Sequence, residues 1–418
     1  MKIRNASSYV VREKLKSPFG FKGHYIDELW QTVVMLEGEN GFCCSCPGVQ
    51  SPLWSDSGVF ERFGPAESNR LMSEVTELAL KKIRGKNVPR PDVLFTSESV
   101  GLFSDASLLC GMKVKPTFVL NALVGLDAAL WMMWAHDQGI VQFEGIIPSY
   151  AKKSMSFRSE KLAHIPLISY GVGPAELRDI LAGGTALLKI KIGNSPEGGD
   201  PDAMLEWDKR RLSEIHNAAD GYLTDMTDDG HVKYYLDANG RYDTPERIGA
   251  LLDHARDIGA LRHIVLLEEP FAPDDMTDVS SLGVCVAADE SAHSLEDVRE
   301  RIGLGYRAVA LKPAAKTFSV SFMMAAAAYE AGAACFCADL TVNPLLVEWN
   351  RQFASRLEPL KGMRCGCLEV NGHQNYVRWE EMKKLLPHSV TYTEPQNGGF
   401  DAGAGFFDRC PLFERNGY

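Results

Sequence analysis

The chain has 418 residues, of which 45% are hydrophobic and 24% charged, and its formal net charge is −11. This acidic balance argues against nucleic acid or an anionic membrane as a partner. No run of about 18 apolar residues occurs, and the N-terminus lacks the apolar segment of a signal peptide, so we expect a cytoplasmic protein. The length predicts more than one domain.

The first 160 residues predict an α+β domain. Residues 1–60 are rich in strand formers, and ELWQTVVMLEG predicts a strand pair that ends in a Glu-Asn-Gly turn. Two helices follow: SNRLMSEVTELALKKIRG begins at a serine cap and ends in glycine, and PTFVLNALVGLDAALWMMWAHDQG is long, apolar and closed by Gly139.

Residues 161–385 alternate between strand and helix patterns, which is typical of a parallel sheet. The strands are predicted at 165–170, 186–192, 234–238, 263–268, 284–289, 307–312, 334–339 and 364–369. The acidic stretch DGYLTDMTDDGHV within 193–233 is longer than a simple crossover needs and suggests a surface insertion. The pattern is lost after residue 386 in a segment rich in glycine and aromatic residues.

Two lysines project from one face of the second predicted strand. Lys189 and Lys191 are two residues apart, and side chains alternate faces along a strand. Burial and a like charge both lower the pKa of a lysine, so this pair suits a general base. Lowering the pKa from ~10.4 to ~7–8 requires about 4 kcal/mol.

Three carboxylates end the next predicted strands. Asp237, Glu268 and Asp289 each follow an apolar run, and their spacing fits one βα unit apiece. Three carboxylate oxygens from successive strands suit one Mg²⁺. Glu269 and Glu290 could be the ligands instead, although alternation allows only one residue of each adjacent pair to face the barrel. Lys312 ends the following strand, facing Lys191 if the strand count is right.

In this order, KIK at 189–191, DAN at 237–239, EEP at 268–270, DES at 289–291 and LKPAAK at 311–316 resemble the motifs of the enolase superfamily, in its mandelate racemase and muconate lactonizing enzyme branch. The resemblance implies a modified (β/α)₈ TIM-type barrel. It also implies that residues 1–160 form a capping domain, that 386–418 pack back on the cap, and that the protein is a homo-oligomer.

The resemblance further implies abstraction of the proton α to a carboxylate, with an enediolate stabilised by Mg²⁺. Lys191 and Lys312 would be the acid/base pair on opposite substrate faces, and Lys189 would tune Lys191 and contact the substrate carboxylate. The seventh predicted strand, within CFCADL, ends in Asp339 without a nearby histidine, which favours the lysine-lysine, muconate lactonizing-like arrangement. The Asp-x-Asp of dipeptide epimerases is absent there, which puts dipeptide specificity in doubt.

Substrate contacts are expected from strand ends and from the cap. Asp339, Glu369 and Asn239 follow strands, although Asn239 could simply form an Asn-Gly turn. Lys316 is expected to support a site residue from behind or to be solvated. The segments 17–25 and 46–60 would close over the barrel mouth. Their predicted contributions to the wall are Phe19, Phe21, His24 and Trp54.

Two opposed lysines make racemisation or epimerisation of a small carboxylate the simplest reaction. Dehydration of an acid sugar and cycloisomerisation proceed through the same enediolate and stay open, so the enzyme would be an isomerase or a lyase. Less favoured are an aldolase that uses a lysine Schiff base and a barrel that only binds a carboxylate.

Overall fold

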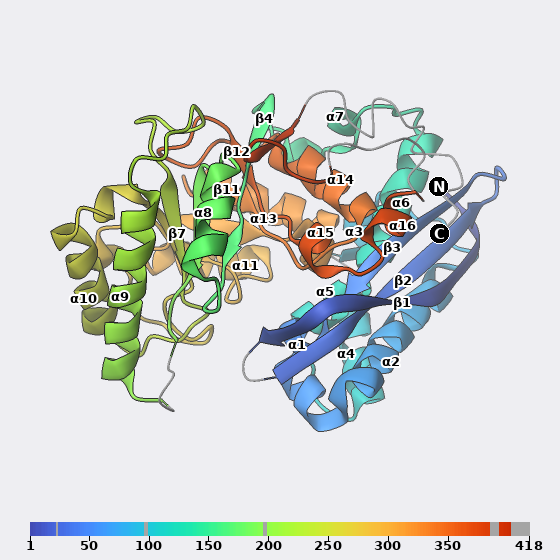
Figure 1. The fold of residues 1–418 in the computed structure, drawn as a ribbon. Coiled ribbons are helices and arrows are strands. Elements are labelled where there is room, and N and C mark those ends of the chain that lie inside the picture. The colour runs from blue at the N-terminus through green and yellow to red at the C-terminus, as the bar shows by residue number, and fades with distance from the viewer. Residues whose placement is uncertain (22–23, 96–98, 195–198, 385–392, 403–418) are drawn as a thin grey trace.

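The computed structural model describes residues 1–21, 24–95, 99–194, 199–384 and 393–402. Figure 1 shows two parts, a cap in blue and cyan and a barrel in green to red. This is the predicted architecture, an N-terminal α+β capping domain beside a modified (β/α) barrel.

The cap contains a three-stranded antiparallel sheet in the order β1 (Ile3–Phe21), β2 (His24–Gly38) and β3 (Cys43–Gln50). The segment ELWQTVVMLEG is a single strand rather than a strand pair: it lies within β2, which pairs with both neighbours. The turn comes where it was predicted, and Gly41 there has a φ of 82° that suits glycine.

The cap helices differ from the prediction at their breaks. The helix α2 (Ser57–Ile83) begins before Ser68, because Asp56 caps it by accepting the N–H groups of Gly58 and Val59. It is interrupted at Gly64, with a φ of 75°. The other cap helices are short or apolar: α1 (Pro52–Ser55), α3 (Pro91–Val93), α4 (Ser99–Cys110), α5 (Pro116–Ala122), α6 (Val124–Asp137), α7 (Phe143–Ile146) and η2 (Ser149–Ala151).

The long apolar helix predicted at 116–139 is two helices, α5 and α6, bent by 51° at Leu123. In the described part of the chain no single helix is long and apolar enough to span a membrane. Among the described helices, only this bent pair, counted as one segment, has the length and the apolar composition of a span. Nearly all side chains of both helices are buried in the cap.

The barrel closes through a first strand that is split in two. β4 (Lys161–His164) pairs with β12 (Gly366–Leu368), and β5 (Leu167–Ile168) pairs with β6 (Leu187–Lys191), so the segment between residues 161 and 168 joins both ends of the sheet. Pro166 separates the halves and has no N–H to offer the ladder. The other strands follow in chain order: β7 (Lys233–Asp237), β8 (Ile264–Glu268), β9 (Val286–Ala288), β10 (Ala308–Leu311) and β11 (Ala334–Cys337).

All eight predicted strand positions occur in the described residues, and the first begins four residues earlier than predicted, at Lys161 instead of 165. The helices are α8 (Pro174–Ala182), α9 (Pro201–Ala219), α10 (Pro245–Asp257), α11 (Leu295–Gly303), α12 (Pro313–Lys316), α13 (Phe318–Glu330) and α14 (Pro344–Ala354). Between β8 and β9 the described chain has only the 3₁₀ turn η4 (Ser280–Leu282), where we expected a full βα unit. Another 3₁₀ turn, η3 (Leu261–His263), leads into β8.

The segment between α9 and β7 lies mostly at the surface, but Met226 and Thr227 within it are buried. Thr227 is fully buried, and Met226 belongs to the cluster of side chains that fills the barrel, together with Leu360 and Met363. Thr227 also forms a β-bridge with Met363. The extra length therefore seals the N-terminal end of the barrel.

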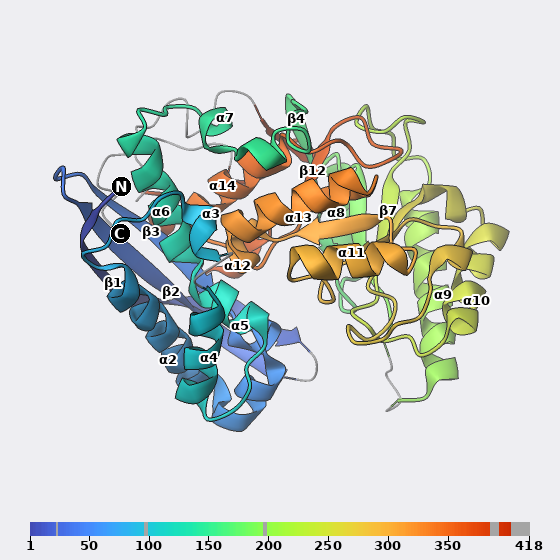
Figure 2. The ribbon, with the colours of Figure 1, turned by 180° about the vertical axis from the view of Figure 1, so that it is seen from behind.

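The outer face of the barrel is partly covered by the cap. Figure 2 shows α11 and α13 side by side in front of the barrel sheet, with the cap helices to their left. The helix α13 contacts both the cap helix α6 and the barrel strands β10 and β11. It is thus one packing link between the two parts, and α12 is another, since it contacts the cap elements α5, α6 and β3.

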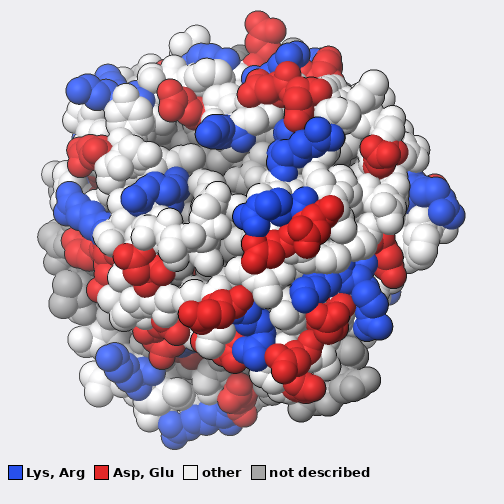
Figure 3. All heavy atoms as spheres, turned by 90° about the vertical axis from the view of Figure 1, so that its left-hand side faces the viewer, with Lys and Arg blue, Asp and Glu red and all other residues white. Residues whose placement is uncertain are grey.

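The face formed around α9 and α10 carries both signs of charge. Figure 3 shows lysine and arginine side chains mixed with aspartate and glutamate on this side. Several are paired within one helix turn, such as Arg256 with Asp253 and Lys209 with Glu206. Exposed pairs of this kind add little stability.

The chain continues after the barrel with α15 (Gly372–Asn375) and α16 (Trp379–Lys383). In the C-terminal segment the described residues include β13 (Gly399–Asp401), which pairs antiparallel with β4 of the barrel sheet. Most of 386–418 lies outside the described residues, so its packing on the cap stays a prediction.

Candidate active site

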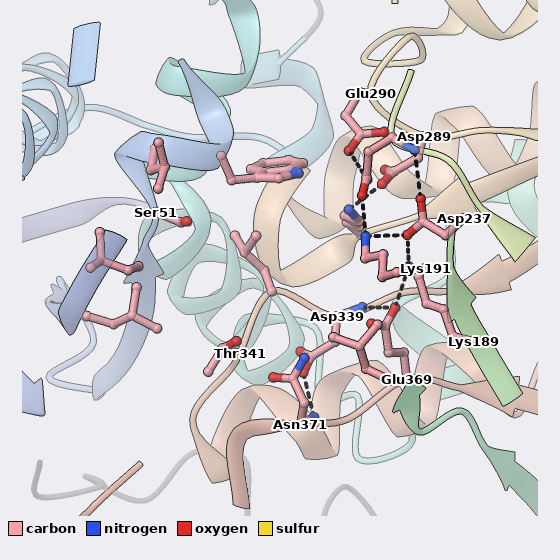
Figure 4. Close-up of a pocket in the computed structure, with 18 of the residues that line it drawn as sticks. Ser51, Lys189, Lys191, Asp237, Asp289, Glu290, Asp339, Thr341, Glu369 and Asn371 are labelled. Carbon is pink, nitrogen blue, oxygen red and sulfur yellow. Dashed lines mark hydrogen bonds and ion pairs between the residues drawn. The ribbon is translucent and has the colours of Figure 1, made fainter. Parts of the chain in front are cut away.

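The carboxyl ends of the barrel strands gather the charged residues that the sequence singles out. Figure 4 shows lysines and carboxylates on one side of a pocket, and Ser51 of the cap on the other. Lys189 and Lys191 come from β6, and Asp237 and Glu268 end β7 and β8. The pocket is lined by Lys189, Lys191, Asp237, Asn239, Asp289, Glu290, Lys312, Asp339 and Glu369 together with cap residues that include Trp54.

Lys189 is the centre of a carboxylate cluster. Its Nζ lies 3.1 Å from Asp237 Oδ2, 3.1 Å from Glu268 Oε2 and 3.3 Å from Glu369 Oε2. Burial lowers the pKa of Lys189, but the three carboxylates outweigh it and hold that pKa well above its usual value. Our expectation of a lowered pKa for this lysine was therefore wrong, because its nearest charges are acidic rather than Lys191.

Lys191 reaches further toward the mouth. Its Nζ donates to Asp237 Oδ2 at 2.6 Å and to the side-chain oxygen of Asn239. The Asn239 amide in turn donates to Glu290 Oε1 at 3.0 Å. Asn239 thus links the β6 lysine to the carboxylates of the opposite wall, besides forming the turn after β7.

Three carboxylates among the described residues come close enough to share one metal ion. Oxygens of Glu268, Asp289 and Glu290 all lie within 4.8 Å of one another. Glu268 Oε1 and Glu290 Oε2 are buried without a hydrogen-bond partner, so the cluster offers oxygens with no other ligand. Burial and neighbouring carboxylates raise the pKa of both glutamates. The donor chemistry fits a divalent cation that prefers oxygen.

Asp237 lies beside this cluster as the ion-pair partner of two lysines. Burial would raise its pKa, but Lys189 and Lys191 lower it below the usual range. Two of the three expected ligands, Glu268 and Asp289, are therefore in the cluster, and Glu290 occupies the third place in it.

On the far side, Lys312 pairs with Asp289 Oδ2, and its Nζ lies 4.8 Å from the ring centre of Trp54. Burial lowers the pKa of Lys312, but Asp289 and Glu290 raise it above its usual value. Lys316 is fully buried, and donates to the backbone oxygens of Asp289 and Ala292 at 2.7 Å. It therefore holds the turn after β9, which excludes the solvated alternative.

The ends of β11 and β12 supply the remaining polar wall. Asp339 accepts the N–H of Asn371 at 2.8 Å, and the N–H of Asp339 donates to Glu369 at 3.3 Å. Burial and the nearby Glu369 raise the pKa of Asp339 to about 7. Asp339 and Glu369 are thus brought together at the pocket, as expected for substrate contacts.

Backbone strain is concentrated at the strand ends. Asn239, Glu269 and Thr341 have φ values of 46°, 41° and 54°, a region that costs free energy for residues other than glycine. The turn at Glu269 directs its carboxylate back to the N–H of Asp289 at 2.7 Å and to Ser291. Glu269 therefore supports the metal cluster and does not enter the pocket.

The cap contributes an apolar wall, formed by Leu15, Ile26, Leu29, Leu53 and Trp54. The enclosed space is small, about 90 Å³. Trp54 lines the pocket, and it does so from the helix α1 within the segment 46–60. The side chains of Phe19, Phe21 and His24 lie outside the described part of the structure, so their predicted contacts stay predictions.

Sequence reasoning missed several residues in or beneath the pocket. Tyr235 donates to Glu268 from inside the barrel, and period two along β7 puts it on the same face as Asp237. This signal was present in the sequence. Thr341, Asn371 and the apolar residues of β1 and β2 had no comparable signal.

The comparisons with known proteins agree with this geometry. Residues 174–358 match the family model described as enolase C-terminal domain-like. No curated protein matches the sequence significantly.

Solved structures match over nearly the whole chain. A mandelate racemase/muconate lactonizing protein from Herpetosiphon aurantiacus is 18% identical with a TM-score of 0.66, covering 96% of this chain and 95% of that one. A dipeptide epimerase from Enterococcus faecalis V583, complexed with Mg and L-Leu-L-Tyr, is 17% identical with a TM-score of 0.64 and coverages of 90% and 92%. An N-succinyl Arg/Lys racemase from Bacillus cereus ATCC 14579 is 16% identical with a TM-score of 0.63 and coverages of 90% and 89%. Residues 174–358 are thus similar to the enolase C-terminal domain family, and the chain as a whole shares the fold of these mandelate racemase/muconate lactonizing structures.

Proposed function

We propose that the protein is a Mg²⁺-dependent racemase or epimerase that removes the proton α to a substrate carboxylate and returns it on the other face. The observation that carries the proposal is the placement of two lysines. Lys191 belongs to the second strand of the barrel and Lys312 follows the sixth, so they approach the pocket from opposite sides.

Glu268, Asp289 and Glu290 would hold the cation, with Asp237 as the alternative third ligand. A divalent cation there would stabilise the negative charge that develops on the substrate carboxylate. That donor set is supported by its two unpartnered buried oxygens.

The chain's own residues divide the proton transfers. One lysine removes the α-proton as general base and the other delivers a proton to the opposite face as general acid. Lys189 would contact the substrate carboxylate, since its Nζ already lies among carboxylate oxygens. Asp339, Asn239 and Glu369 would orient the polar groups of the substrate.

The cap wall favours this reaction over dehydration of an acid sugar. A sugar presents hydroxyl groups in every direction, and leaving them without partners is costly. The wall above the lysines is formed by leucine, isoleucine and tryptophan side chains. A carboxylate with an apolar group on the α-carbon fits it better. The epimerase and the racemase of similar fold support the same reaction class. Homo-oligomerisation and a cytoplasmic location remain part of the proposal.

The test is α-proton exchange in D₂O with Mg²⁺, followed by NMR for both enantiomers of N-acyl amino acids, hydroxy acids and acid sugars. Lys191→Ala and Lys312→Ala should each abolish racemisation. Each variant should retain exchange with one enantiomer, and the two variants should retain opposite ones. With the other enantiomer, the rate of exchange in each variant should fall by about 10²–10⁴-fold.

Removal of the metal with EDTA should stop exchange with every substrate. Lys209→Ala, a change at a half-buried lysine on the outer helix α9 that pairs with Glu206, serves as the control that leaves exchange unchanged. Loss of water during exchange would identify a dehydratase instead. Trapping of substrate by borohydride without metal would identify Schiff-base chemistry and contradict the proposal.

A further inference from the structure

The small inner pocket opens into a second, larger one. The outer pocket has a volume of about 500 Å³, against about 90 Å³ for the inner one. Leu167, Lys191, Asn239 and Asn371 line both, so the two spaces are continuous. Pockets for small ligands usually enclose about 300–1,000 Å³. The inner pocket therefore suits only the reacting end of a substrate, and the outer pocket has room for a remote end.

The outer pocket contains a fixed arginine. Arg241 Nη1 donates to Tyr170 Oη at 2.9 Å and to the backbone oxygen of Gly193 at 3.1 Å, and its guanidinium lies 5.4 Å from the centre of the Tyr170 ring. These contacts hold one edge of the guanidinium in place. Among the described residues no ion pair includes Arg241, although the buried Asp208 is near enough to interact with it electrostatically. Its remaining donors therefore have no direct carboxylate contact in the part of the chain that the structure describes.

Most of the polar side chains around Arg241 can donate hydrogen bonds, which suits a ligand that accepts them. Gln374, Asn375 and Ser17 line the same space, and each can donate a hydrogen bond. Lys191 lies at the inner end, and the exposed Glu176 is the one carboxylate among the lining residues. An arginine with a planar fork of donors binds a carboxylate with two parallel hydrogen bonds.

We infer that the outer pocket is a subsite for a second anionic group, so that the substrate is a carboxylate whose remote end carries another carboxylate bound by Arg241. The inference rests on the proposed function, because it assumes that the first carboxylate binds beside the β6 lysines. Tyr170 is then a positioning residue, since it contacts the guanidinium rather than the substrate.

The test measures binding, so that it does not depend on turnover. Linear dicarboxylates from glutarate to suberate are titrated into the protein with Mg²⁺ by calorimetry, each beside the monocarboxylate of equal length. At least one dicarboxylate should bind about tenfold more tightly than its monocarboxylate, the usual contribution of hydrogen bonds to a charged group. Arg241→Gln should remove this difference, and Arg241→Lys should keep part of it.

Arg256→Gln, on the exposed face of α10, is the matched control and should leave the preference intact. If Arg241→Gln weakens the binding of dicarboxylates and monocarboxylates equally, Arg241 only holds the surrounding loops in place, and the proposed subsite is wrong. Equal affinity of the wild-type protein for both ligand types would also overturn the subsite. A dicarboxylate preference without any α-proton exchange would keep the subsite and reject the proposed reaction.

Discussion

Lys189 is a buried cation that three carboxylates share, with only 4% of its surface exposed. Such a residue stabilises the site chiefly by preventing repulsion between its partners. Removal of one member of a buried charge network commonly costs about 3–5 kcal/mol. Lys189→Met should therefore lower the free energy of unfolding by about 3 kcal/mol, measured by urea denaturation without metal.

Added Mg²⁺ should restore part of that loss, since the cation would bring positive charge to the same oxygens. Lys233→Met is the comparison, because this buried lysine at the N-terminal end of its strand pairs only with Asp229 among the ion pairs described. A Lys189→Met protein as stable as the wild type would show that the three carboxylates accept protons in place of the lysine.

The third metal ligand can be tested separately. Glu290→Gln should weaken Mg²⁺ binding by about 10–100-fold in calorimetry, since Glu290 belongs to the compact cluster. Asp237→Asn should weaken it less, because the Asp237 carboxylate is already bound by two lysines. The reverse order would restore Asp237 to the position that the sequence motifs suggested.

The residues at the strand ends could be predicted because two signals agree within a strand. The sequence motifs and the alternation of side chains between the two faces select the same residues. Glu268 is the last residue of β8, and the choice between it and Glu269 follows from alternation. The strand β9 ends at Ala288, so Asp289 and Glu290 no longer alternate, and both belong to the carboxylate cluster with Glu268. Periodicity cannot predict side-chain direction beyond the end of a strand.

At the scale of elements, a buried hydrogen-bond network joins the cap strand β2 to the barrel loops. Gln31 donates to Tyr376 Oη at 3.0 Å and accepts from Asn343 at 3.0 Å, while Tyr376 Oη donates to the Thr341 backbone oxygen at 2.6 Å. Because Thr341 lines the pocket with a strained backbone, the network holds a wall of the site in place.

Tyr376→Phe removes this hydroxyl and leaves the amide of Gln31 and the oxygen of Thr341 unpaired. Unfolding free energy should fall by about 1–3 kcal/mol, measured by urea denaturation. Once a substrate is known, its KM should rise more than kcat falls. Tyr329→Phe, a change at an exposed tyrosine on α13, is the control. Unchanged stability and KM would show that water replaces the hydroxyl.

The elements themselves were partly predictable. Strands of β-branched and aromatic residues between glycines were placed to within a few residues, apart from the first, whose KLAH half has a weak pattern. The helix between β8 and β9 was expected from spacing alone, but Pro270 and Pro273 follow β8 and disfavour a helix there. Interruptions such as Gly64 depend on tertiary packing.

At the scale of the whole molecule, one buried carboxylate links the two domains. Asp127 on the cap helix α6 accepts the N–H groups of Phe318 and Ser319, at 2.7 and 3.1 Å, and the Ser319 hydroxyl. These groups form the N-terminus of the barrel helix α13, where a negative charge is favoured. Burial nevertheless raises the pKa of Asp127 from 3.8 to about 7.

A raised native pKa means that the folded protein holds a proton that the unfolded chain has lost. The contribution of Asp127 to stability is therefore complete below about pH 4 and declines as pH rises to about 7, by up to about 1.4 kcal/mol per pH unit. The difference in unfolding free energy between wild type and Asp127→Asn should show this slope between pH 5 and 7 and flatten above. If the unfolding free energies of wild type and Asp127→Asn change with pH in parallel, the pKa of Asp127 is not raised in the folded protein.

The split first strand has a consequence for synthesis of the protein. The β4 half can pair only after β12 and β13 exist, and these lie more than 200 residues later in the chain. A nascent chain that has reached β11 therefore carries an open parallel sheet, with β5 and β11 as unpaired edges. Exposed edges promote association between chains, and non-local pairing is slow. We expect the barrel to close only after β12 has been synthesised, and truncation before residue 366 to yield aggregates rather than a smaller folded enzyme.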